Sequence, residues 1–193
     1  KLVSLTILDF AQENLENFES YFRSSQLTQR IDEAAPAITN NLMNIKIRAE
    51  FIPRASVEGN YTINFSNPIY HPHDTHVGSV TSSSFTYFGN VLCSLRDNNG
   101  LMQVVSSTGQ ILHANIGTVN YATGTVSLVG FVPTVAADDS ISIIAVPEHE
   151  DIVPNAEQLI TILESEITVS MVDDSSINQG TLTNPTYGSV TEY

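Results

Sequence analysis

Apolar and polar residues alternate most clearly in the middle of the chain. From Asn44 to Phe51 every second residue is apolar, and the residues between are polar or charged. The segment "NYTINF" repeats this pattern with Tyr61, Ile63 and Phe65. A period of two is typical of a β-strand with one buried face. A shift of one residue would bury the polar set, so the pattern also fixes the register.

Short strand-like segments follow at close intervals. They are "SSFTYF", "NVLCSLRD", "LMQVVS", "GTVNYATGTVSLVGF" and "DDSISIIAV", the last of which stops at Pro147. Asn99-Gly100 predicts a tight hairpin turn, because both residues tolerate positive φ. In the longest segment, Ala122-Thr123-Gly124 predicts the link of a second hairpin, with Gly124 in the left-handed conformation.

The N-terminal part has a different period. Apolar residues recur at helical spacing along one stripe, at Ala11, Leu15, Phe18 and Phe22. This stripe predicts a helix that Asp9 caps at its start. A second short helix is expected from about Gln26 to Glu33, and Pro36 ends the helical region.

These patterns predict an α+β fold that is mainly β, with short N-terminal helices followed by antiparallel β hairpins or sandwich-like sheets. Residues 1–40 form a helical segment, which belongs to a preceding domain of a longer chain or to a dimerisation region. Residues 41–172 form a β-rich domain, in which 154–172 is read as two extended segments and not as a helix. The acidic tail, 173–193, lacks a period and is expected to be extended or to become ordered against a partner.

Charge is distributed unevenly and limits the classes of partner. The net charge is −14, and all seven basic residues lie at or before Arg96, whereas twelve acidic residues follow it. Such a surface repels phosphate backbones and anionic lipid, so neither nucleic acid nor a membrane is an expected partner. No run of 18 apolar residues occurs. The single cysteine, Cys93, alternates with Val91 and Leu95 and is expected to be a small core residue.

Three histidines in six residues, His71, His73 and His76, are the only candidate metal ligands. His71 and His73 project to one side of an extended backbone, as two ligands of one ion must, and Asp74 could orient a ligand. Against a metal, Pro72 makes the segment irregular and no further ligand motif is found. A polar loop is therefore preferred; a structural or intermolecular metal site, or a metallohydrolase built on this trio, remains the alternative.

Other catalytic signatures are missing from the sequence. It contains no G-x-S-x-G elbow, no phosphate-binding loop and no dinucleotide fingerprint. The acidic pairs Asp138-Asp139 and Asp173-Asp174 lie in turn-like contexts, where exposed carboxylates are common. The sequence therefore predicts a protein that is not an enzyme, with no catalytic residue and no cofactor.

Several sequence segments, taken in order along the chain, resemble a known family. "ENFESYFRSSQLTQRIDEAAPAI" precedes the alternating strand with "FIPR", and "YTINFSNPIYHPHDTHVGSVTSSSFTY" and "IGTVNYATGTVSL" follow. In this order, over residues 8–172, the chain resembles the C-terminal region of the baseplate wedge protein of T-even-like contractile-tailed phages. That protein is related to the baseplate J-like proteins.

The resemblance implies a structural role. Such wedge proteins dimerise and link neighbouring wedges into a ring around the tail hub. The expected partners are a second copy, as a homodimer or higher homo-oligomer, and other baseplate wedge proteins. The expected location is the virion tail baseplate, after assembly in the host cytoplasm. The alternative reading is a β-sandwich module of a tail or adhesin that binds a receptor or carbohydrate.

Overall fold

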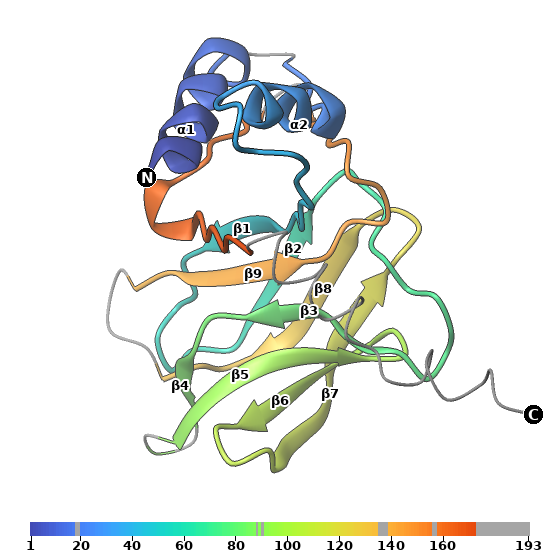
Figure 1. Cartoon of the computed structure of the whole chain (residues 1–193). Helices are drawn as coiled ribbons and strands as arrows, with labels where there is room; N and C mark the ends of the chain where they lie inside the picture. Colours follow the sequence, from blue (N-terminus) through green and yellow to red (C-terminus); the bar gives the residue numbers. More distant parts are fainter. Residues whose placement is uncertain (18–19, 88, 90, 135–138, 156–157, 173–193) are drawn as a thin grey trace, which may run out of the picture.

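The computed structural model describes residues 1–17, 20–87, 89, 91–134, 139–155 and 158–172, and it places two helices on one side of a curled β-sheet (Figure 1). The helices are α1 (Leu2–Asn14) and α2 (Ser24–Asp32), and a short 3-10 turn, η1 (Glu164–Glu166), follows the sheet. The strands are β1 (Ile47–Phe51), β2 (Gly59–Asn64), β3 (Val77–Ser82), β4 (Phe85–Tyr87), β5 (Val91–Asn98), β6 (Leu101–Ser106), β7 (Ile111–Asn120), β8 (Thr125–Phe131) and β9 (Ile141–Ala145).

In the described part of the chain, all nine strands belong to one antiparallel sheet. Their order is β1-β9-β3-β5-β6-β7-β8-β2, and β4 pairs with β5. The end strands β1 and β2 are not hydrogen-bonded to each other, but the rings of Phe51 and Tyr61 lie 4.9 Å apart between them. The sheet is thus nearly closed. The predicted class, α+β and mainly β, is confirmed, with one continuous curled sheet in place of separate sheets.

Both predicted hairpins are present. Asn99 and Gly100 have φ values of 46° and 79° and connect β5 to β6, as a two-residue turn with both central residues at positive φ requires. The second hairpin joins β7 to β8, and Asn120 pairs with Thr125 at its end. Gly124 has a φ of 68°, so it occupies the predicted left-handed conformation.

Gly124 also lies against the backbone of another loop, which predicts a large effect of substitution. A Cβ at this position would collide with the carbonyl oxygen of Asn67. Gly109 has a similar φ of 86° but faces open space, so it is the matched control. We expect Gly109→Ala to lose about 1 kcal/mol through backbone strain, and Gly124→Ala to lose a further 1–3 kcal/mol or so through the collision. Urea unfolding of both variants measures the difference, and equal losses would contradict the predicted contact.

The start of the chain differs from the prediction. α1 begins at Leu2, and Asp9 lies on its exposed face instead of capping it. The inward stripe starts earlier, with Val3, Ile7 and Phe10, and helical structure ends before the predicted stripe does. The prediction was wrong because two of the stripe's later apolar positions, Leu15 and Phe22, lie outside the helix. Phe22 reaches the same core from an isolated bridge to Ile152, and Phe18 lies outside the described residues.

Two apolar clusters stabilise the part of the chain that the structure describes. The larger cluster fills the inside of the curled sheet. It includes Leu95, Val126 and Phe131, whose side chains are fully buried. Cys93 belongs to it, as predicted. The smaller lies between the helices and nearby segments; its buried members are Phe10, Ala11, Leu15, Phe22, Leu27, Ile31 and Ile152. Ile47 packs against both clusters, so the two parts share a contact surface.

The segment after the sheet returns to the helices. Ile160 and Ile162 pack against the smaller cluster, while Leu159, Thr161 and Leu163, which alternate with them, are exposed. This alternation is that of an extended chain, and the described residues 158–172 contain no α-helix and join no strand. We call α1, α2, residues 38–45 and the described residues 152–155 and 158–163 the helical layer. The predicted behaviour of the tail, 173–193, concerns residues outside the described part.

Asp151 connects this returning segment to α2. Its carboxylate accepts hydrogen bonds from the Arg23 guanidinium at 2.7 Å and from the Ser24 N–H at 3.0 Å, at the first turn of the helix. These two groups lower the pKa of Asp151 below its usual value of 3.8. A carboxylate at a helix N-terminus accepts a hydrogen bond from a backbone N–H that has no partner within the helix, and its negative charge interacts favourably with the helix dipole.

This contact predicts an acid-sensitive contribution to stability. Because folding lowers the pKa of Asp151, its contribution is present above pH 3.8 and is lost as the pH falls through the lower value of the folded state. We expect Asp151→Asn to be less stable than the wild type at neutral pH, and the gap to shrink in acid. The exposed neighbour Glu150→Gln is the control. Thermal unfolding from neutral to acidic pH measures the gap; a gap independent of pH would contradict the assignment.

Candidate functional site

The three histidines lie together in the loop between β2 and β3. Ring centroids are 6.3 Å apart for His71 and His76 and 5.6 Å for His73 and His76, and both pairs meet edge to face. His73 is exposed, and its Nδ1 lies 2.9 Å from the Thr75 hydroxyl. In the described residues, no group of three or more His, Cys, Asp or Glu side chains is arranged to hold a metal ion. The imidazoles are close, but their arrangement is that of packed rings.

Hydrogen bonds from the Asn67 side chain and from the Ile69 backbone fix the loop to the rest of the fold. The buried amide of Asn67 donates to the carbonyls of Phe65 and Val153, at 2.8 and 2.9 Å, and accepts the Val153 N–H at 2.9 Å. The Ile69 N–H donates to the Tyr121 carbonyl at 2.8 Å. The loop is therefore held from both sides, by the returning segment and by the second hairpin.

A buried carboxylate beneath the loop was not predicted as a site. Asp97 is 0% exposed. Its Oδ1 accepts the Val80 N–H at 2.8 Å, and its Oδ2 accepts the Tyr121 hydroxyl at 2.7 Å. That hydroxyl in turn accepts the Gly100 N–H at 2.9 Å, and the Tyr121 ring stacks on His71 with centroids 3.9 Å apart. One polar network thus joins the first hairpin, β3 and the histidine loop.

The electrostatics of this network favour a fixed arrangement. Burial raises the pKa of Tyr121 above its usual value of 10.0, and the hydrogen bond to Asp97 raises it further. The phenol therefore stays protonated and donates. Both Asp97 oxygens already accept a hydrogen bond from another described residue. What the arrangement does chemically is to satisfy buried donors and fix strand positions, as buried polar groups generally do.

The sequence did hold a signal for Asp97. It continues the inward alternation of Cys93 and Leu95 along β5, and all three are buried. An acidic residue in phase with core positions indicates either a functional group or a paired structural one. Asp97 was not predicted to be buried because it begins the turn sequence "DNNG", and Asp is also common at the start of an exposed turn.

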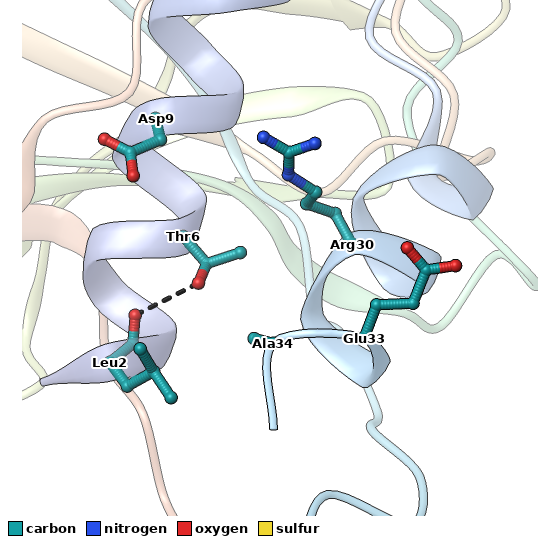
Figure 2. Close-up of a pocket in the computed structure, with 6 residues that line it drawn as sticks. All are labelled: Leu2, Thr6, Asp9, Arg30, Glu33 and Ala34. Carbon is teal, nitrogen blue, oxygen red and sulfur yellow. Dashed lines mark hydrogen bonds between the residues drawn. The ribbon is translucent and has the colours of Figure 1, made fainter. Parts of the chain in front are cut away.

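A shallow groove lies between the two helices, away from the histidine loop. Its volume is about 330 Å³, and Figure 2 shows its lining side chains: Leu2, Thr6, Asp9, Arg30, Glu33 and Ala34. The Thr6 hydroxyl donates to the Leu2 carbonyl within α1, and Arg30 forms an exposed ion pair with Glu13 at 3.1 Å. The groove mixes charged and apolar groups without the convergent polar set of a catalytic site.

Comparison with known proteins gives no identification: no protein family and no curated protein matches the sequence. Neither described helix is long and apolar enough to cross a membrane.

Proposed function

We propose that this chain is a structural assembly subunit that acts through contacts with other protein chains. The observation that carries the proposal is the set of exposed apolar side chains on the helical layer and the segment that follows it. Leu42 is 90% exposed and Met171 81%. The other members are Leu2, Leu5, Leu159, Leu163 and Val172. Exposed apolar side chains also occur on the sheet and its loops, such as Ile52 and Val129, but the three most exposed, Leu42, Met171 and Val172, all belong to these two parts. Single exposed apolar residues are ordinary, whereas highly exposed ones that lie together are typical of interaction surfaces.

Helix α1 supports the same proposal. Its inward face buries Phe10 and Ala11, while Leu2 and Leu5 on the outward face are 53% and 49% exposed. A surface helix normally places polar residues on its outward face, and a helix that is apolar on several sides is normally covered. The rest of the outward face carries Asp9, Gln12 and Glu13, so the part of α1 that fits contact with another protein is its first turn, at Leu2 and Leu5.

The finer proposal is a wedge subunit of a contractile-tail phage baseplate, in which dimers link neighbouring wedges. Its support is the resemblance of residues 8–172 to such proteins, together with a mainly β body that carries helices on one side. A subunit of this kind transforms no substrate, so we propose that the histidine loop and the Asp97 network are structural.

Light scattering of the purified chain tests the proposal. We expect a mass of at least twice 21.0 kDa at micromolar concentration. Leu5→Glu should weaken self-association, since it places a charge beside Leu2 in the exposed apolar first turn of α1. Gln12→Glu, also exposed on α1, adds the same charge without removing an apolar side chain and is the matched control. A wild type that stays monomeric would contradict the proposal.

A further inference from the structure

Residues 167–172, with the sequence ITVSMV, have the character of a β-strand but lie in no sheet. Ile167 leaves η1 in an extended conformation, with φ −85° and ψ 115°. Val169 is 38% exposed and Met171 81%. No backbone hydrogen bond joins residues 168–172 to any other described residue.

The composition of this segment explains why it needs a sheet. Isoleucine, valine and threonine are β-branched and favour strands, where their side chains pack on a pleated surface. In the described chain the segment has no strand partner, and most of its side chains are exposed, apart from the half-buried Ile167. An extended peptide of this kind commonly binds by adding a strand to an exposed sheet edge.

The edge that fits it is that of β1. Within the described residues β1 pairs only with β9, so its other edge carries unpaired backbone groups. Lys46 and Arg48 lie at this strand, whereas the chain after Arg96 contains no basic residue. The segment itself is uncharged, but it begins next to Glu164 and Glu166 of η1, whose charge is opposite to that of Lys46 and Arg48.

The start of the segment is already held beside β1. Arg48 forms an ion pair with Glu166 at 2.6 Å, and Figure 1 shows the red end of the chain running toward β1. The donor segment and the acceptor edge therefore lie on the same side of the molecule. A two-fold axis at this side would let each copy supply both elements, as a symmetric dimer interface requires.

We propose that residues 167–172 of one copy pair with the free edge of β1 in a second copy, and that the exchange is reciprocal. The inference deepens the proposed function, since it rests on self-association and names the two elements that make it. Main-chain hydrogen bonds supply affinity, and the apolar side chains of Val169 and Met171 gain a covering surface.

Proline substitutions at alternate positions of the segment test the proposed strand pairing. In a strand paired along one edge, only alternate N–H groups point to the partner, and proline removes the N–H while tolerating an extended chain. We compare Val169→Pro/Met171→Pro with Thr168→Pro/Ser170→Pro. We expect one double variant to weaken dimerisation by about tenfold to a hundredfold, from two lost hydrogen bonds, and the other to change it little.

The two outcomes that overturn the inference are distinct from failure of the proposed function. If the wild type dimerises and neither proline variant weakens it, or both weaken it equally, then strand exchange is wrong and the proposed function stands. If the wild type is monomeric, both fail. The monomer fold should be unchanged in both variants, because these N–H groups form no hydrogen bond with any described residue.

Cross-linking identifies the acceptor strand. The background is Cys93→Ser, which removes the only cysteine. Chains carrying Ser170→Cys are mixed with chains carrying Glu50→Cys or Ile52→Cys, and the mixture is oxidised. We expect a covalent heterodimer in at least one mixture, at a higher yield than the homodimers formed by each chain alone. Dimerisation without any such cross-link would overturn the assignment to β1.

Discussion

Replacing Phe131 by alanine should destabilise the protein by about 3–5 kcal/mol, the typical cost of emptying a fully buried aromatic position. Phe131 is 0% exposed. Its ring lies 5.3 to 6.5 Å from the rings of Phe51, Tyr61, Phe85 and Tyr87. These residues come from β1, β2 and β4, so the ring fills the space where the sheet does not close by hydrogen bonds.

The neighbouring position supplies the control for this prediction. Val132 follows Phe131 and is 36% exposed. We expect Val132→Ala to change stability by no more than about 0.5–1 kcal/mol, since an exposed apolar side chain contributes little. Urea unfolding with linear extrapolation measures both variants. Similar losses at the two positions would show that the aromatic cluster does not close the sheet.

Asp97→Ala should be the second severe change, with a loss of about 2–6 kcal/mol. It leaves two buried donors, the Val80 N–H and the Tyr121 hydroxyl, without their acceptor. Each unsatisfied buried donor costs about 1–3 kcal/mol. The loss should be accompanied by a looser histidine loop, because Tyr121 stacks on His71.

Two milder variants separate the parts of this network. Tyr121→Phe keeps the ring against His71 but removes the hydroxyl, so it should cost about 1–3 kcal/mol. Asp97→Asn keeps one carbonyl oxygen for the Val80 N–H and should cost less than Asp97→Ala. The unfolding free energies of the three variants give the order directly. An Asp97→Ala variant as stable as the wild type would contradict a structural role for the carboxylate.

Much of the sheet could be predicted because its strands obey local rules. The alternation around Ile47 and Phe51, the Asn99-Gly100 turn and the left-handed Gly124 each depend on a few neighbouring residues. The order of strands could not be predicted in this way. β9 lies between β1 and β3, where Ala145 pairs with Ile47, 98 positions away, and with Val80, 65 positions away. Only tertiary packing specifies such pairings.

The errors in the predicted N-terminal helix also arise because tertiary packing, and not the local pattern, decides where these residues lie. Phe22 fits a helical stripe with Leu15 by spacing alone, yet it reaches the small core through a bridge to Ile152. A periodic pattern identifies residues that share a core, but it does not show whether each of them lies in a helix, a strand or a loop. The histidine cluster was visible in the sequence, whereas its stacking partner Tyr121 and the carboxylate beneath it depend on distant hairpins.

The two apolar clusters suggest how the proposed assembly role and stability are divided. The larger core, inside the curled sheet, is built from buried aromatic and β-branched residues. The helical layer has the smaller core and carries exposed apolar side chains such as Leu5 and Leu42. We propose that the sheet supplies the rigid body and that the helical layer, the free edge of β1 and residues 167–172 make the contacts, so that partner binding leaves the larger core unchanged.

Immunogold electron microscopy of particles from the organism that encodes this chain tests the central proposal most directly. Antibodies raised against the purified protein are applied to contractile-tailed particles, with preimmune serum as the control. A baseplate wedge subunit predicts gold at the baseplate end of the tail. Strong expression of the chain with no label on intact or disrupted tails would contradict the proposal.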